Sequence, residues 1–223
     1  MKAVISGYGR MGHMIEKTLK DSGIEVAGAS EDIAAFPADE AKDCVCIDFT
    51  TPEAFRKNYP VLAAKFKAVV VGTTGWDDIR DEVVECFEKA GTPMIWSANF
   101  SVGVTVFSAA VSLISKDLAQ AGGYSPYIVE KHHIHKLDAP SGTAKSLAAV
   151  VKEGMGIYPP VSSVRVGELA GTHTVGFEGF GDRITLEHEA FSRQGFASGA
   201  VLAAKMTEGL TGVHEFKELF IKE

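Results

Sequence analysis

The chain has 223 residues, of which 46% are hydrophobic and 23% charged, the composition of an ordinary globular protein with one large or two small domains. A formal net charge of −7 argues against nucleic acid as a partner. We expect no membrane segment, because no apolar run approaches the roughly 18 residues that a spanning helix needs. We also expect no signal peptide, because Met1 and Lys2 lead straight into a strand.

The first predicted element is a strand followed by a glycine loop and a helix. Residues 2–6 are mostly apolar, a Gly-x-Gly-x-x-Gly motif follows at once, and apolar residues then recur at helical spacing until Gly23. In this motif Gly7 permits a tight turn, Gly9 lets a pyrophosphate approach the backbone, and Gly12 lets helix and strand pack closely. The pattern in this context favours a dinucleotide site. A glycine-rich helix start without a ligand is the alternative.

Further β–α units follow the first. After a second strand at residues 24–29, Glu31 stands about 20 residues past the glycines, where an acid binds a ribose diol. Three more strands end in small or polar residues. Ligands bind beyond the carboxyl ends of strands in an open parallel sheet, so these ends are candidate cofactor contacts, although each alone is equally typical of a simple turn. The strands cover residues 44–49, 68–71 and 93–96, and helices are predicted from residue 53, over 76–90 and over 104–119.

A change of pattern in the second half of the chain indicates a second domain. Apolar and polar residues alternate there, with a hairpin turn at residues 179–182, before a final helix over residues 196–210. We therefore predict an α/β protein with two domains. The second is expected to contain a mostly antiparallel open sheet. The predicted domains are a Rossmann-type dinucleotide-binding domain, residues 1–103 and 208–223, and an α+β substrate-binding and oligomerisation domain, residues 104–207.

Residues 130–144 hold three of the seven histidines within four residues, together with Lys131 and Lys136. The strand predicted at residues 127–129 would place these side chains at its carboxyl end. A Pro-Ser-Gly-Thr turn follows, and then a helix whose unpaired N–H groups and positive dipole suit an anion such as a carboxylate. One stretch thus offers imidazoles, an amine and an anion site, which is the equipment for protonating an anionic substrate.

Plainer interpretations of this stretch stay open. Serine or threonine before a helix is usually only a cap, and aspartate is typical of turns. A metal site would need His132, His133 and His135 to converge on one ion. Consecutive residues on a strand point to opposite faces, and Lys136 would repel the ion, so we expect no metal.

The same stretch resembles the signature of bacterial dihydrodipicolinate reductases. The matching string is Glu-x-His-His-x-His-Lys-x-Asp-Ala-Pro-Ser-Gly-Thr-Ala at residues 130–144. The resemblance extends over the whole chain, through the glycine motif at residues 7–12, Gly-Thr-Thr-Gly at 72–75, Ser-Ala-Asn-Phe-Ser-Val-Gly-Val at 97–104 and Ser-Arg-x-x-Phe-Ala-x-Gly-Ala at 192–200. A string of this length and specificity is not expected by chance.

The family resemblance implies a Rossmann domain, a mixed α+β substrate domain and a homotetramer assembled through the substrate-domain sheets. By position, His132 resembles the family's acid/base and Lys136 its proton donor. The residues that resemble substrate ligands are His133, Ser141, Gly142 and Thr143. The residues that resemble cofactor contacts are Gly7, Tyr8, Gly9, Arg10, Met11, Gly12, Glu31, Gly72, Thr73, Thr74, Ser97, Ala98, Asn99, Phe100 and Ser101.

The resemblance implies an enzyme of lysine biosynthesis by the diaminopimelate route. It would use NADH or NADPH to reduce a small cyclic dicarboxylate, 4-hydroxy-tetrahydrodipicolinate or dihydrodipicolinate, to tetrahydrodipicolinate. His132 suits proton delivery, assisted by Lys136, because an unperturbed imidazole titrates near neutral pH. We expect a cytoplasmic location, which the three core-like cysteines also favour. The rival hypotheses are a non-catalytic dinucleotide-sensing protein on the same fold and a related amino-acid dehydrogenase.

Overall fold

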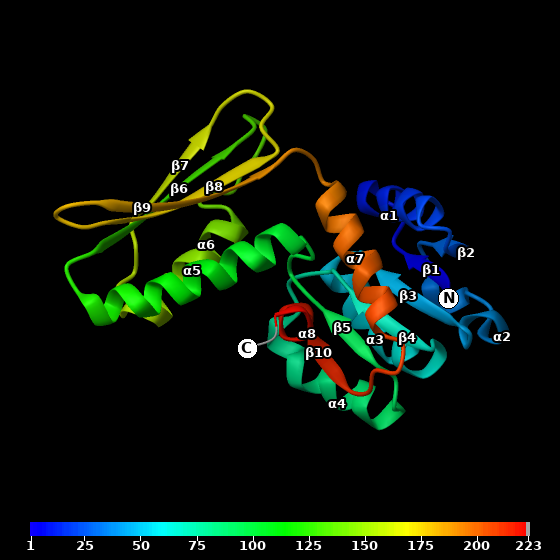
Figure 1. The fold of residues 1–223 in the computed structure, drawn as a ribbon. Coiled ribbons are helices and arrows are strands. Elements are labelled where there is room, and N and C mark those ends of the chain that lie inside the picture. The colour runs from blue at the N-terminus through cyan, green and yellow to red at the C-terminus, as the bar shows by residue number, and fades with distance from the viewer. Residues whose placement is uncertain (222–223) are drawn as a thin grey trace. The chain divides into compact units, whose positions relative to one another are not determined.

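The computed structural model describes residues 1–221, and the contacts within it divide the chain into two compact units (Figure 1). The first unit contains Met1–Ser101 and the chain from Phe196 onward, and the second contains Val102–Gly195. The second unit therefore begins close to the expected position at residue 104. The chain returns to the first unit at Phe196, earlier than the expected boundary at residue 208.

A parallel six-stranded sheet forms the centre of the first unit. Its strand order is β10-β5-β4-β3-β1-β2, and the order reverses between β1 and β3, the point where ligands bind in open α/β sheets. All residues of β3 and β4 are buried, as central parallel strands require. The elements that alternate along the chain are β1 (Lys2–Ser6), α1 (Arg10–Asp21), β2 (Glu25–Ser30), β3 (Cys44–Asp48), α3 (Pro52–Lys65), β4 (Ala68–Val71), α4 (Arg80–Ala90) and β5 (Met94–Trp96).

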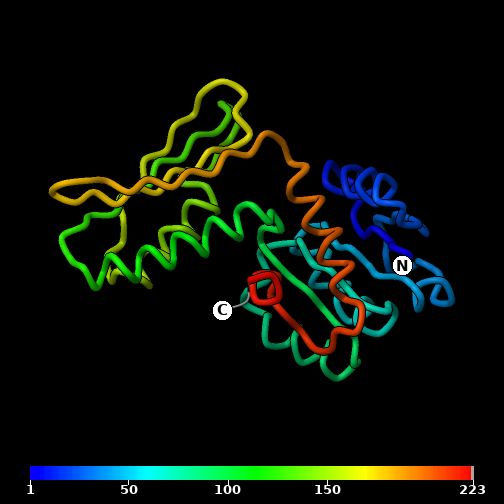
Figure 2. The backbone as a smooth tube through the Cα atoms, viewed as in Figure 1, coloured from blue at the N-terminus to red at the C-terminus, as the bar shows by residue number. Residues whose placement is uncertain are grey.

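Short elements complete the first unit. The helix predicted over residues 76–90 is interrupted, since a 3₁₀ turn precedes α4. Trp76 explains the interruption, because its buried indole N–H donates to the carbonyl of Thr73 at 2.7 Å and holds a turn there. At the end of the described chain β10 lies beside β5 (Figure 2). The short elements are η1 (Ile33–Ala35), α2 (Ala38–Ala41), η2 (Asp77–Ile79), β10 (Val213–Glu215) and α8 (Phe216–Phe220).

The second unit is a four-stranded sheet with two helices along one face (Figure 1). Its order is β7-β6-β8-β9, and β6 pairs parallel with β7 but antiparallel with β8. The sheet is mixed, so the expectation of a mostly antiparallel sheet is wrong. Because α6 lies between β6 and β7 in the chain, the connection is a crossover, which produces a parallel pair. The elements are α5 (Val102–Ala121), β6 (Ser125–His132), α6 (Gly142–Met155), β7 (Val161–Arg165), β8 (Gly171–Glu178) and β9 (Arg183–Ala190).

Helix α5 corrects the expectation that no apolar stretch of the chain approaches the length of a membrane-spanning helix. With 20 residues it is long and apolar enough to cross a membrane, judged by length and composition alone. In the structure Phe107 and Val111 of α5 instead join the core between the helices and the sheet of the second unit, together with Leu147 of α6 and Phe177 of β8. The apolar character of this helix is therefore accounted for in part by core packing.

Helix α7 (Gln194–Met206) belongs to the first unit for most of its length, and small residues explain its close packing there. Ala197, Ala200 and Ala203 are fully buried. A Cβ placed on Gly199 would lie 1.6 Å from the carbonyl oxygen of Phe100. The helix thus approaches the backbone after β5 more closely than any side chain permits. The unit boundary therefore lies in the first turn of α7, between Gly195 and Phe196, and not at residue 208.

This close approach yields a stability prediction. In an open helix, Gly→Ala stabilises by roughly 1 kcal/mol, but Gly199→Ala should lower the free energy of unfolding by about 1–3 kcal/mol because the new methyl overpacks the site. Denaturant unfolding measures the change. The control is Ser198→Ala, an exposed neighbour in the same helix that should have little effect. Stabilisation by Gly199→Ala would contradict the packing described here.

Candidate active site

The glycine loop of the first unit has the geometry that a dinucleotide site requires. Gly7 has φ +85°, and a Cβ there would lie 2.4 Å from the carbonyl oxygen of Phe49. A Cβ on Gly12 would lie 2.4 Å from the carbonyl oxygen of Gly7, so helix α1 packs directly on the turn. A Cβ on Gly9 would meet nothing within 4 Å, and this exposed position leaves the backbone open to a ligand. These three environments match the three roles expected of the motif.

The other candidate cofactor contacts lie in the same unit. The Glu31 carboxylate accepts a hydrogen bond from the Tyr8 backbone N–H at 2.6 Å, so the acid after β2 rests against the glycine loop. In the loop after β5, Ser97 Oγ accepts from the Asn99 N–H at 3.1 Å, which gives that segment a fixed turn. Since these segments follow parallel strands of the same sheet, they lie at one edge of it, and they fit the extended shape of a dinucleotide.

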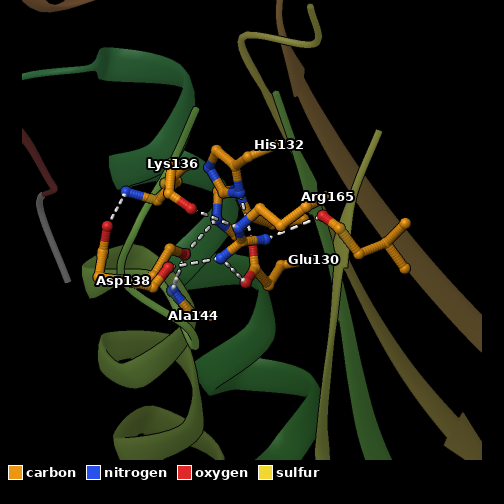
Figure 3. Close-up of polar contacts among 9 residues, drawn as sticks. Glu130, His132, Lys136, Asp138, Ala144 and Arg165 are labelled. Carbon is orange, nitrogen blue, oxygen red and sulfur yellow. Dashed lines mark hydrogen bonds and ion pairs between the residues drawn. The ribbon is translucent and has the colours of Figure 1, made fainter. Parts of the chain in front are cut away.

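Strand β6 positions the central groups of the second unit. Glu130 and His132 are two residues apart and so point to the same face, where their exposed fractions are 0% and 7%. His132 Nδ1 is hydrogen-bonded to Glu130 Oε2, and Arg165 at the end of β7 donates from Nη2 to Glu130 Oε1 at 2.8 Å (Figure 3). The carboxylate is therefore shared between a titratable imidazole and a permanent cation.

Arg165 also holds the loop that contains Lys136. Its Nη2 donates to the Asp138 carbonyl at 2.6 Å, and its Nε donates to the Lys136 carbonyl at 3.2 Å (Figure 3). The Lys136 ammonium pairs with the Asp138 carboxylate at 2.7 Å. One guanidinium thus ties the strand carboxylate and the following loop together, as its planar set of five donors allows.

The charges in this cluster shift its pKa values in ways that suit acid/base chemistry. Burial alone would raise the pKa of the Glu130 carboxyl, but hydrogen bonds from Arg165, Ser163 and His132 outweigh it and lower the pKa to about 2. Burial lowers the pKa of His132, and the hydrogen bond to Glu130 opposes that effect. Glu130 therefore stays ionised beside His132, whose pKa lies below the ordinary value of an imidazole because burial outweighs the effect of the carboxylate.

The turn before α6 is built by a second buried pair. Ser141 Oγ accepts from the Ala144 N–H at 3.2 Å, so it is the helix N-cap, and it is hydrogen-bonded to His173 Nε2 at 3.1 Å. Burial, and then the nearby charge of His132, lower the pKa of His173 to about 4. Gly142 is exposed at the first helical position. Ser141 is thus a helix cap, and the first turn of the helix is still exposed to solvent at Gly142.

The structure gathers some of the predicted residues and separates others. His132 and Lys136 belong to the cluster around Arg165, whereas His133 lies half-buried beyond the strand, with its ring 5.9 Å from that of His135. His135 is exposed and pairs with Glu168 at 3.1 Å. The three neighbouring histidines therefore do not converge.

The sequence analysis assigned no role to three residues of the cluster, which are Glu130, Arg165 and His173. The period of two along β6 already puts Glu130 on the face of His132, and that signal was available. One ligand atom each from Glu130, His132 and His173 lies within 4.8 Å of the others, a spacing that a metal ion would accept. Arg165 already occupies one oxygen of Glu130, and its charge opposes a cation, so the prediction of no metal stays a prediction.

Known proteins resemble this chain over nearly its whole length. Family models described as the N-terminus and the C-terminus of dihydrodipicolinate reductase match residues 1–100 and 103–220. The chain belongs to the dihydrodipicolinate reductase family. The 4-hydroxy-tetrahydrodipicolinate reductase of Christiangramia forsetii is 35% identical, with 98% of this chain and 97% of that protein aligned. The reductase of the same name from Archaeoglobus fulgidus is 39% identical, with 92% and 93% aligned.

A solved structure shares the fold. A dipicolinate-bound dihydrodipicolinate reductase from a Paenisporosarcina species superposes with a TM-score of 0.85 and 23% identity, covering 98% of this chain and 99% of that one. Membership of the family confirms the predicted function, which is NAD(P)H-dependent reduction in lysine biosynthesis, and the N-terminal Rossmann-type domain of the family binds the nucleotide. The hypotheses of a non-catalytic sensor and of a related amino-acid dehydrogenase are set aside.

The Glu130–His132 pair makes a pH prediction for this reductase. If protonated His132 is the acid, kcat/KM is high below the pKa of His132 and is lost as the pH rises through it. The Glu130 carboxylate raises that pKa, so Glu130→Gln should move the loss of kcat/KM to lower pH. Steady-state rates across pH 5–9 measure this, with buffers matched in ionic strength. Glu168→Gln, which alters the exposed partner of His135, is the control and should leave the midpoint unchanged. An unmoved midpoint in Glu130→Gln would disprove the coupling.

Proposed function

We propose that His132 delivers the proton and that Lys136 assists it by stabilising negative charge on the substrate. The observation that supports this assignment is the hydrogen bond between the buried Glu130 carboxylate and His132 Nδ1, which leaves Nε2 as the nitrogen that exchanges a proton. Lys136 is part of the same cluster through its carbonyl contact with Arg165. The arrangement has the form of a carboxylate orienting a general acid.

We propose that the substrate carboxylates bind at the start of α6 and beside His133. The N–H groups of Gly142 and Thr143 belong to the first turn, where the helix dipole favours an anion. Ser141 supports that turn through its cap and its contact with His173, and its backbone adjoins the same site. The Paenisporosarcina relative was solved with dipicolinate, a planar cyclic dicarboxylate, which supports the expected substrate class.

The nicotinamide supplies the hydride when the cofactor is bound. We propose that Gly7 to Gly12 hold the pyrophosphate and that Glu31 binds the adenosine ribose. The loops after β4 and β5 complete the site, with Gly72, Thr73 and Thr74 in the first and residues 97–101 in the second. The open backbone at Gly9 and the contact between Glu31 and the glycine loop support this assignment.

We also propose a homotetramer in the cytoplasm. The four-stranded sheet is covered by α5 and α6 along one face, and its other face is the surface through which the family resemblance implies assembly. Cys44, Cys46 and Cys86 are free thiols, as a reducing compartment would leave them. On this proposal the first unit is the nucleotide-binding domain and the second, residues 102–195, is the substrate-binding and oligomerisation domain.

The role of His132 is tested by His132→Ala. Loss of a general acid should lower kcat by about 10²–10⁴-fold while the dissociation constant for NADH stays unchanged. Stopped-flow turnover and direct NADH titration measure the two quantities. His135→Ala removes an exposed histidine from the same stretch and should retain full turnover. Near wild-type kcat in His132→Ala would show that another group delivers the proton.

The charges beside the ribose site predict cofactor preference. Glu31 and Asp32 stand together after β2, both exposed, and two acids repel a 2′-phosphate. Arg10 in the glycine loop is a possible counter-charge, but one arginine facing two acids should not reverse the balance. We therefore expect NADH to be used at least as well as NADPH, and Asp32→Arg to shift the ratio of kcat/KM toward NADPH. A tenfold or larger preference for NADPH in the wild type would show that Arg10 prevails.

A further inference from the structure

A buried carboxylate in the first unit has no part in the roles proposed so far. Asp48, the last residue of β3, has an exposed fraction of 0%. Its Oδ2 accepts from Ser6 Oγ at 2.6 Å, and its Oδ1 accepts from Thr73 Oγ1 at 2.5 Å and from Thr50 Oγ1 at 3.1 Å. Burial raises the pKa of Asp48, and these hydroxyl hydrogen bonds oppose the rise. Within residues 1–221 no ion pair to this carboxylate is present.

The hydroxyl partners of Asp48 lie at the ends of neighbouring strands. Ser6 ends β1, and Thr73 lies two residues beyond β4, so the carboxylate links three adjacent strands in the order β4-β3-β1. The strand order reverses between β1 and β3. The hydrogen bond between Ser6 and Asp48 therefore spans the point at which a ligand binds in a sheet of this type.

An ionised carboxylate accepts hydrogen bonds and donates none, so it fixes the direction of every bond in the group. The Thr73 hydroxyl donates a hydrogen bond to Asp48. The oxygen of the same hydroxyl is then left to accept a hydrogen bond from the Thr50 N–H at 2.7 Å. Backbone contacts run in parallel, from the Gly72 N–H to the Asp48 carbonyl at 2.8 Å and from the Phe49 N–H to the Ser6 carbonyl at 2.9 Å. The segments after β1, β3 and β4 are thus held as one arrangement.

We infer that Asp48 is a positioning residue for the dinucleotide, and that its carboxylate holds the glycine loop, the Thr50 segment and the Gly72–Thr74 loop in a single binding surface. The inference rests on the proposed assignment of the glycine loop and of the Gly72–Thr74 loop to the cofactor. Packing supports it independently, because the turn at Gly7 lies directly against the carbonyl of Phe49, the residue after Asp48. A shift of the Asp48 segment would therefore displace the turn that faces the pyrophosphate.

Asp48→Asn tests the inference with little change in size. A carboxylate has two acceptor oxygens, whereas an amide has one acceptor oxygen and an NH₂ group that only donates. At least one of the hydroxyls of Thr73 and Ser6 can therefore no longer donate its hydrogen bond to residue 48. We expect the dissociation constant for NADH, measured by fluorescence titration of the full chain without substrate, to rise about tenfold or more. The KM for NADH should rise with it, while kcat at saturating NADH and the KM for the dicarboxylate stay within about twofold of wild type.

Thr92→Val is the matched control. The Thr92 hydroxyl is also buried and donates to the Ala63 carbonyl at 2.6 Å, but it precedes β5 at the amino-terminal edge of the same sheet. Its loss should lower the melting temperature without changing the affinity for NADH. If Thr92→Val and Asp48→Asn weaken NADH binding equally, Asp48 affects binding only through the stability of the fold, and the inference is overturned.

Ser6→Ala provides a second variant if Asp48→Asn does not fold. It removes one hydrogen bond to Asp48 and should raise the dissociation constant for NADH about threefold or more, and the two substitutions combined should be less than additive because they act on one group. A folded Ser6→Ala or Asp48→Asn that binds NADH as wild type does would refute the inference. Failure of the wild-type chain to bind either NADH or NADPH would instead contradict the proposed function.

Discussion

Glu130 is a carboxylate without solvent exposure, and the arrangement of the second unit's site depends on how its charge is compensated. An ion buried alone costs several kcal/mol, so a fully buried carboxylate requires a cation and donors around it. Arg165 supplies the cation from the neighbouring strand, and His132 supplies a donor from the same strand. The requirement for compensation thereby fixes the imidazole, and through Arg165 it also fixes the loop that contains Lys136.

The two units hold buried carboxylates in different ways, because one has a cation beside it and the other is surrounded by hydroxyls. In the second unit the hydrogen bonds from Arg165 and its neighbours lower the pKa of Glu130 to about 2, which keeps a permanent negative charge beside His132. In the first unit Asp48 is surrounded by hydroxyls, burial raises its pKa, and its bonds link strand ends. One carboxylate raises the pKa of a neighbouring imidazole, and the other is hydrogen-bonded to residues at the ends of neighbouring strands.

The features that the sequence could predict are those encoded locally. The glycine motif specifies its own turn and helix, so the positions of Gly7, Gly9 and Gly12 follow from residues within a few positions of one another. The alternation of apolar and polar residues, with the turn at residues 179–182, predicted the hairpin between β8 and β9. The alternation of side chains along a strand also predicted that His132 and His133 point to opposite faces. The site roles derived from the family resemblance stay predictions until they are measured.

The features that the sequence did not predict depend on contacts between distant residues. Arg165 is 35 positions from Glu130, and no local pattern indicates that pairing. The parallel pairing of β7 depends on the crossover through α6, which the alternation of apolar residues in the strands does not encode. The placement of α7 depends on the contact between Gly199 and the backbone of Phe100, and a glycine in a helix gives no sign of what it packs against.

The central claim is that Glu130 holds a proton on His132 Nδ1 and leaves Nε2 free to exchange. Long-range ¹H–¹⁵N spectra of the protein labelled with [¹⁵N]histidine measure this directly, with the signals of His132 identified by their loss in His132→Asn. The account predicts that at neutral pH Nδ1 of His132 is protonated and Nε2 is not, and that Nε2 gains its proton as the pH falls. A neutral His132 protonated at Nε2, with Nδ1 bare beside Glu130, would contradict the account.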